Sequence, residues 1–120
     1  MEVKCVRILD CYTGETLSSG RTLRVRKTYL VLEIMIHKGA QTFIRIDTLG
    51  EGTPSIEDLN QFEVVDSAIP PEWIVRDSHS HIDIGPAEWL EPTFWEKYFD
   101  GESGAVATYH RILSDVYGLK

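Results

Sequence analysis

The sequence predicts one mainly β domain, a small antiparallel barrel followed by two C-terminal helices. Residues 1–69 hold five short runs rich in β-branched and aromatic residues, separated by turns that contain glycine or proline. Pro70 and Pro71 then impose an extended stretch, and helical spacing appears only after it. A chain of 120 residues is long enough to bury a core in one such domain.

The predicted strands come first in the chain, at residues 3–9, 22–25, 29–37, 42–48 and 62–65. In the third of them Leu30, Leu32, Ile34 and Ile36 fall on one face, as expected for a strand that covers a core. A hairpin through residues 38–40 would place the apolar faces of the third and fourth strands side by side. Short antiparallel strands of this kind favour a curled barrel of five or six strands.

The second part of the domain, residues 70–120, is expected to be an extended connector and two short helices packed on the barrel. Within it, residues 74–84 would add one more strand or form an irregular edge. Thr93 begins a capping-box pattern that predicts a short helix, and Gly101 marks its end. A second helix is predicted over residues 103–117, where apolar residues form one stripe.

Charge is distributed unevenly along the chain. Residues 1–45 carry eight basic and four acidic side chains, whereas residues 46–120 carry four basic and fifteen acidic ones, which together give the net charge of −7. The predicted partner-binding residues lie in a stretch without lysine or arginine: Asp47, Glu51, Glu57, Asp58, Glu63 and Asp66. Such a stretch attracts a basic protein partner and repels nucleic acid. The alternative is that these charges only keep a small domain soluble.

A run of alternating histidines supports a different hypothesis, a metal-dependent hydrolase. On a strand, His79, His81 and Asp83 would project from one face, and these ligands suit zinc or iron. The run locally resembles the first-strand metal motif of the amidohydrolase barrels and the His-x-His-x-Asp-His motif of the metallo-β-lactamase fold. The latter needs a further histidine where this chain has Ile84. We therefore expect no metal or other cofactor, and a metal site at these three residues is the alternative.

A nucleic-acid-binding barrel is the second alternative. Its basic cluster would be Arg21, Arg24, Arg26 and Lys27, with Tyr12 and Tyr29 as stacking faces. The isoelectric point near 5 opposes this hypothesis, because phosphate binding would be weak and local. Nucleic acid is thus not the expected partner.

The remaining motifs favour a non-enzymatic cytoplasmic protein. No serine lies in a nucleophile elbow, and no glycine-rich loop leads into a lysine-bearing helix start. Cys5 and Cys11 match no metal or redox spacing and are expected to stay reduced. The chain starts without a signal-peptide pattern and has no apolar stretch of membrane-spanning length, so no membrane partner is expected. The sequence does not indicate an oligomeric state.

Three segments, residues 23–32, 43–50 and 62–65, resemble bacterial small-barrel proteins of the SH3-like kind, with Arg26 at the position of the usual glycine. Residues 89–109 are similar in texture to the tails of immunity proteins from polymorphic toxin systems. The resemblance implies a five- or six-stranded SH3-like barrel, and we expect the two C-terminal helices to cover an open edge or the mouth of this barrel. It also implies an immunity protein that neutralises a basic toxin, such as a nuclease domain, by occluding its active site with an acidic face.

Overall fold

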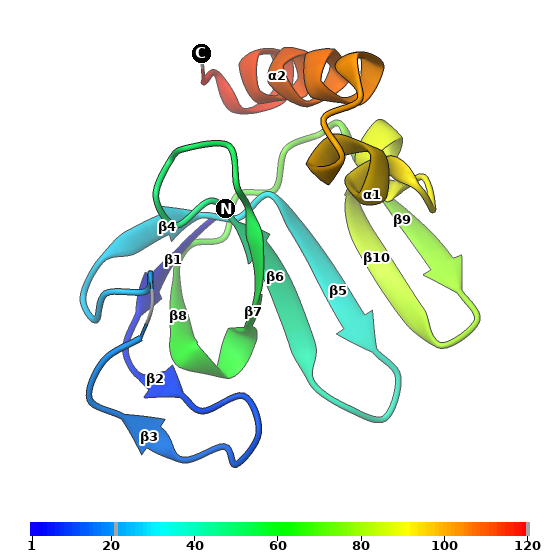
Figure 1. Cartoon of the computed structure of the whole chain (residues 1–120). Helices are drawn as coiled ribbons and strands as arrows, with labels where there is room; N and C mark the ends of the chain where they lie inside the picture. The colour runs from blue at the N-terminus through cyan, green and yellow to red at the C-terminus, as the bar shows by residue number, and fades with distance from the viewer. Residues whose placement is uncertain (21, 120) are drawn as a thin grey trace.

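The computed structural model describes residues 1–20 and 22–119 and has three antiparallel sheets and two C-terminal helices (Figure 1). The largest sheet has the strand order β7 (Ser55–Asp58), β6 (Thr42–Ile46), β5 (Glu33–His37), β10 (His81–Pro86) and β9 (Trp73–Ser78). The second has the order β4 (Thr28–Leu30), β1 (Glu2–Cys5) and β8 (Phe62–Asp66). A two-stranded arm is formed by β2 (Ile8–Leu9) and β3 (Thr16–Leu17).

Two connections carry the chain from one large sheet to the other. The strand β4 continues through Val31 and Leu32 into β5, and the amides of these two residues bond the carbonyls of Met1 and Arg45 at 3.0 and 2.8 Å. A single 3₁₀ turn, η1 (Leu59–Gln61), links β7 to β8. No backbone ladder joins β7 to β8 among the described residues. The mainly β prediction is confirmed, whereas the described residues form three separate sheets in which a closed barrel is not shown.

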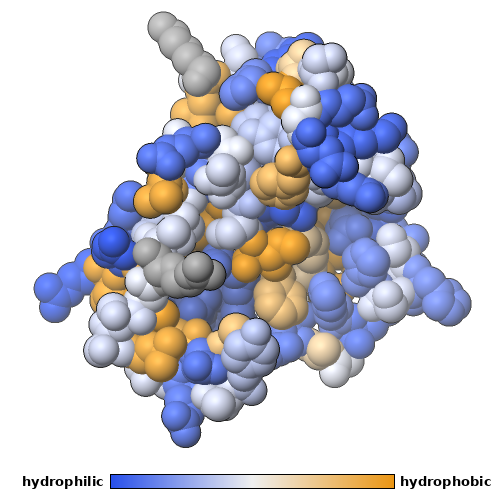
Figure 2. All heavy atoms as spheres, in the orientation of Figure 1, coloured by the Kyte–Doolittle hydropathy of each residue, from blue (hydrophilic) through white to orange (hydrophobic). Residues whose placement is uncertain are grey.

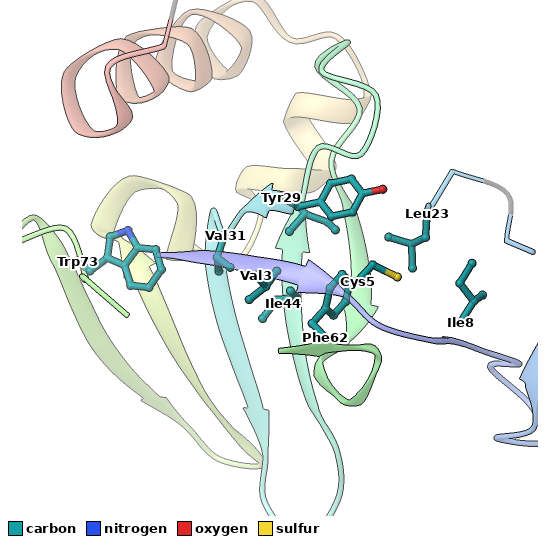
Figure 3. Close-up of a cluster of buried hydrophobic side chains, with 10 residues drawn as sticks. Val3, Cys5, Ile8, Leu23, Tyr29, Val31, Ile44, Phe62 and Trp73 are labelled. Atoms are coloured by element: carbon teal, nitrogen blue, oxygen red, sulfur yellow. The ribbon is translucent and has the colours of Figure 1, made fainter. Parts of the chain in front are cut away.

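The first core cluster lies between the two large sheets (Figure 3). Its buried members are Val3, Cys5, Ile8, Leu23, Tyr29, Val31, Ile44, Ile46, Phe62 and Trp73. Val3, Val31, Ile44 and Ile46 are fully excluded from solvent. Since these residues come from β1, β6 and the β4–β5 junction, burying them fixes both sheets against each other.

The second core cluster lies under the C-terminal helices α1 (Phe94–Phe99) and α2 (Ser103–Tyr117) and the 3₁₀ turn η2 (Ala87–Leu90). Its buried members are Leu32, Trp89, Phe94, Tyr98, Ala105, Tyr109, Ile112 and Leu113. Tyr117 connects this cluster to the first, because its hydroxyl accepts a hydrogen bond from Trp73 Nε1 at 2.8 Å and donates one to the Leu32 carbonyl.

Residues 74–84 do not form the single strand or irregular edge that we expected, nor is the segment after residue 70 an extended connector. The chain reverses at His79 and Ser80, so that Ser78 faces His81, and it makes the hairpin β9–β10. The strand β10 also pairs with β5. The physical reason is that β5 would otherwise end the sheet with an open edge, and β10 satisfies its backbone groups.

Other boundaries also differ from the sequence-based expectation. Residues 22–25 form a loop and not the expected strand, although Leu23 is buried. The strand that pairs with β2 is β3. Thr93 makes no capping hydrogen bond, and α1 begins where the Phe94 amide bonds the Glu91 carbonyl at 3.0 Å. The predicted helix over residues 103–117 is confirmed, and Gly118 ends it with φ 68°. None of the described helices has the length and hydropathy needed to cross a membrane.

Candidate protein-binding face

The six carboxylates that the sequence groups together are distributed over both large sheets. Asp47 and Glu51 lie in the loop between β6 and β7, Glu57 and Asp58 lie on β7, and Glu63 and Asp66 lie on β8. None of the six forms an ion pair with a described residue. They therefore share an uncompensated charge but do not form one continuous face.

Three of these carboxylates also hold loops in shape. Asp47 accepts hydrogen bonds from the amides of Glu51 and Gly52 at 3.2 and 2.8 Å. Asp58 accepts from the Asn60 amide and Asp66 from the Ala68 amide, both at 2.9 Å. A carboxylate has about four acceptor positions, so each of the three retains free capacity for a partner.

Glu57 points to the opposite side of β7 from Asp58. It lies across from the buried Ile44, on the side of the sheet that faces the first core cluster. Burial raises the pKa of Glu57, and its charge contributes, after burial itself, to a raised pKa of the Cys5 thiol. Glu57 is thus a half-buried side chain at the margin of the core, not a member of an exposed face with Asp58.

Glu63 and Asp66 lie on the other large sheet. Glu63 is the register partner of Lys4, and Asp66 is the register partner of Glu2. The residue before Glu63 is the buried Phe62, so Glu63 itself points outward from the three-stranded sheet. These two carboxylates are therefore separated from those of the β6–β7 loop.

Apolar side chains reach the surface close to Asp47, Glu51 and Asp58. Ile56 is 51% exposed and Phe99 is 53% exposed. Figure 2 shows hydrophobic side chains grouped in the middle of one face of the molecule, below the C-terminal helices, with hydrophilic residues around them. Exposed apolar groups bordered by charge are typical of protein-binding surfaces.

A chain of contacts connects these apolar residues. Ile56 is the register partner of Arg45, the Arg45 guanidinium lies 4.1 Å from the centre of the Trp95 ring, and the rings of Trp95 and Phe99 are 6.0 Å apart. Ile56 and Asp58 share one face of β7. We call this surface the acidic aromatic face, made by Asp47, Glu51, Ile56, Asp58, Trp95 and Phe99.

The β6–β7 loop is fixed to the same surface by α1. The Tyr98 hydroxyl donates a hydrogen bond to the Gly52 carbonyl. Burial raises the pKa of Tyr98, and the nearby charge of Asp47 raises it further. Asp47 and Glu51 are thereby held beside the helix that carries Trp95 and Phe99.

A buried ion pair supports the acidic aromatic face from below. Arg45 Nε donates to Glu33 Oε1 at 2.6 Å, and both side chains are almost fully buried. Burial raises the pKa of Glu33, and Arg45 opposes this shift. The other carboxylate oxygen of Glu33, the Trp95 indole nitrogen and the Tyr109 hydroxyl are buried without a hydrogen-bond partner among the described residues. The pair fixes the position of Trp95 through the stacked guanidinium.

Only two of the three residues of the alternative metal site are brought together. His79 lies in the β9–β10 turn and is exposed, whereas His81 and Asp83 lie on β10 and contact each other at 3.1 Å between Nε2 and Oδ2. His37, across from His81 on β5, lies nearby, with ring centres 5.7 Å apart. Within the described part of the chain, no three histidine, cysteine, aspartate or glutamate side chains are arranged to hold a metal ion.

The basic cluster of the nucleic-acid alternative lies in the loop before β4. Arg24 Nη1 bonds the Leu23 carbonyl, and the Lys27 ammonium lies 5.3 Å from the centre of the Tyr29 ring. Tyr29 is 5% exposed and belongs to the core, so the expectation that it offers a stacking face is wrong. Tyr12 is fully exposed on the arm, and Arg21 lies outside the described residues.

The acidic aromatic face has no nucleophile paired with a base. Its carboxylates can attract cations, and Ile56, Trp95 and Phe99 can bury against an apolar surface. This arrangement is suited to binding a protein. Comparison with known proteins adds no family to this description, because no family model, curated protein or solved structure matches the chain.

Proposed function

We propose that this protein is a non-enzymatic binding protein that neutralises a basic protein partner through its acidic aromatic face. The observation that carries the proposal is that Asp47, Glu51 and Asp58, which have no ion-pair partner among the described residues, share the acidic aromatic face with the exposed Ile56 and Phe99. A bacterial toxin such as a nuclease is the partner that this chemistry favours, since its phosphate-binding cleft is lined with lysine and arginine.

Binding would proceed in two physical stages. The net charge of −7 first attracts the cationic cleft and accelerates encounter, an effect that added salt weakens. Phe99 and Ile56 then lose water against the partner, and buried aromatic residues commonly dominate interface energy. The carboxylates replace the substrate phosphates and block the partner's active site.

We also propose that the two large sheets form an SH3-like arrangement that is open on one side. Three features support this: β1 lies between β4 and β8, the bent β4–β5 strand belongs to both sheets, and η1 connects β7 to β8. Arg26 has φ 77°, the left-handed conformation that glycine adopts most readily, at the position where related barrels have glycine. The added hairpin and helices would then cover the open side.

The cytoplasm is the compartment that this proposal favours. Cys5 is buried and Cys11 is exposed, and neither is in a disulfide. An exposed free thiol is stable in a reducing compartment, where cytosolic reductants maintain it.

A quantitative pull-down from the native organism tests the proposed function. The bait is the wild-type protein, the double variant Glu51→Lys/Asp58→Lys, or the matched control Glu63→Lys/Asp66→Lys on the other sheet. We expect a basic protein that the wild type and the control retain at low salt and that the first variant loses. Equal retention by all three baits, or recovery of nucleic acid in place of protein, would reject the proposal.

A further inference from the structure

The edge strand β9 lacks the protection that the edges β7 and β8 have. The strand β7 has four residues and ends in Glu57 and Asp58, and β8 has an irregular register with β1 between Glu2 and Val3. Charges and bulges of this kind discourage an added strand. In contrast, β9 has six residues in regular register with β10, and it lies at the rim of the sheet (Figure 1).

The register determines which backbone groups of β9 face away from the sheet. Ser78 and His81 flank a two-residue turn, so they form a hydrogen-bonded pair, and the pairs alternate from there along the strand. Val75 and Asp77 therefore direct their amides and carbonyls outward. Neither residue has a further backbone hydrogen bond among the described residues. Trp73, next in the same alternation, bonds its amide to the Pro70 carbonyl at 3.1 Å.

Exposed apolar side chains of β9 project from both faces of the sheet. Ile74 is 40% exposed and Val75 is 66% exposed, and neighbouring strand residues point to opposite faces. The charged residues of the strand are already engaged, since Asp77 pairs with Lys38 at 2.7 Å and Arg76 bonds the Leu90 carbonyl at 3.0 Å. The open edge thus offers hydrogen bonds and apolar contacts.

An acidic hollow of about 250 Å³ lies at the Trp73 end of β9, beneath α2. Its lining includes Glu72, Pro86, Glu88, Arg111 and Asp115. Arg111 pairs with Glu88 at 3.0 Å, whereas Glu72 and Asp115 have no ion-pair partner among the described residues. A strand added along β9 would end beside this hollow, where a lysine or arginine side chain could pair with the two carboxylates.

We propose that β9 binds an extended segment of the basic partner as an added strand, with a lysine or arginine of that segment in the hollow. The cationic character of the partner rests on the proposed function, whereas strand addition does not depend on the acidic aromatic face. A second copy of the chain is disfavoured as the occupant, because each copy carries −7 and two-fold pairing about Val75 would place Arg76 opposite Ile74 without filling either hollow.

The test uses capped peptides of alternating valine and threonine that end in two lysines, with the lysines at either terminus. Binding to ¹⁵N-labelled protein is followed by amide shifts, and the protein alone is examined by sedimentation. We expect the Val75 and Asp77 amides to respond most. N-methylation of alternate peptide residues removes the hydrogen-bond donors along one edge of the peptide and should weaken binding about tenfold or more. Replacement of the lysines by glutamate should weaken binding by a similar factor.

Two protein variants at one exposed position complete the test. Val75→Pro removes an outward amide that the ladder with β10 does not use, and we expect it to weaken peptide binding about tenfold. Val75→Thr retains that amide and should bind within about twofold of the wild type.

Each alternative outcome overturns strand addition. These outcomes are absent peptide binding, equal binding by Val75→Pro, shifts confined to the acidic aromatic face, or a self-associated protein that Val75→Pro converts to monomer. The proposed function is judged separately, because only its own test depends on Glu51 and Asp58.

Discussion

Arg45 is held between the Glu33 carboxylate and the Trp95 ring, and this contact links the sheet to α1. A buried ion pair contributes little net stability when intact, but removal of one partner leaves a buried charge and costs about 3–5 kcal/mol. Its value here is positional, since the stacked guanidinium fixes the aromatic ring next to Phe99. The intact ion pair between Glu33 and Arg45 therefore contributes more to the geometry of the surface than to the free energy of unfolding.

The first prediction concerns the pH dependence that Glu33 produces. Its pKa in the folded state is raised above the ordinary value of 4.5, so the folded protein binds the proton more tightly than the unfolded chain. The contribution of Glu33 protonation to the free energy of unfolding is fully present below pH 4.5 and is lost as the pH rises through the pKa of the folded state. The variant Glu33→Gln lacks this loss, and its stability relative to the wild type should rise with pH above 4.5.

Urea unfolding of both proteins over a pH series measures this difference. A constant gap between the two free energies of unfolding at every pH would show that Glu33 titrates alike in the folded and unfolded states. The absolute cost of leaving Arg45 unpaired does not affect the test, because only the slope with pH is compared.

The second prediction concerns the strained backbone at Arg26. With φ 77°, Arg26 is in a region that costs a non-glycine residue about 1–2 kcal/mol. Glycine avoids most of this cost, but ordering its more flexible backbone on folding costs about 0.5–1 kcal/mol more. Arg26→Gly should therefore stabilise the protein by about 0.5–1 kcal/mol. Lys27→Gly, at a neighbour without positive φ, should destabilise it. Thermal unfolding that orders the two variants the other way would contradict this account.

At the scale of elements, the docking of α2 depends on Tyr117. Its hydroxyl accepts a hydrogen bond from the Trp73 indole N–H at the start of β9 and donates one to the carbonyl of Leu32, just before β5. One side chain thus joins the last helix to two strands of the same sheet. Burial raises the pKa of Tyr117 strongly, so the hydroxyl keeps its proton and remains a donor.

The third prediction follows from this double contact. Tyr117→Phe leaves the Trp73 indole and the Leu32 carbonyl without their partner and should lower the free energy of unfolding by about 1–3 kcal/mol. Tyr12→Phe changes the same atom on a side chain that is 94% exposed and should have no measurable effect. Chemical denaturation of both variants provides the comparison. An equally small effect of the two substitutions would show that α2 docks without these hydrogen bonds.

Elements with a strong local pattern were predictable from the sequence. The apolar stripe and Gly118 predict α2, because the spacing of apolar residues within a helix indicates its buried face and a glycine indicates its end. The β9–β10 hairpin was not predictable from its turn, since His79 and Ser80 are not typical hairpin-turn residues. It forms because β10 pairs with β5, which lies more than forty residues earlier in the chain.

The candidate site was predictable only in part, for similar reasons. Asp47, Glu51 and Asp58 were visible as acidic residues without basic neighbours. Glu57 could have been separated from Asp58 by strand alternation once residues 55–58 were recognised as a strand. The connection from Ile56 through Arg45 to Trp95 and Phe99 depends on how α1 packs on the sheet, which no local pattern specifies.

At the scale of the whole molecule, the unpaired carboxylates outnumber those in ion pairs. Among the described residues after residue 45, the carboxylates in ion pairs are Asp77, Asp83, Glu88 and Glu91. The basic loop before β4 leads into the three-stranded sheet, whereas Asp47, Glu51 and Asp58 lie on β7 or in the loop before it, at the edge of the five-stranded sheet. A partner with a positive cleft would thus be oriented as it approaches, since the charge is unevenly distributed over the fold.

The measurement that tests this account most directly is the association rate of the recovered partner, followed by stopped flow as a function of salt. Glu51→Lys/Asp58→Lys and Glu63→Lys/Asp66→Lys change the net charge equally, but only the first pair alters the acidic aromatic face. We expect the first variant to associate about tenfold or more slowly at low salt, with the difference shrinking as salt rises, and the second to stay within about threefold of the wild type. Equal slowing of both variants would contradict the central claim, because the net charge alone, and not this face, would then govern binding.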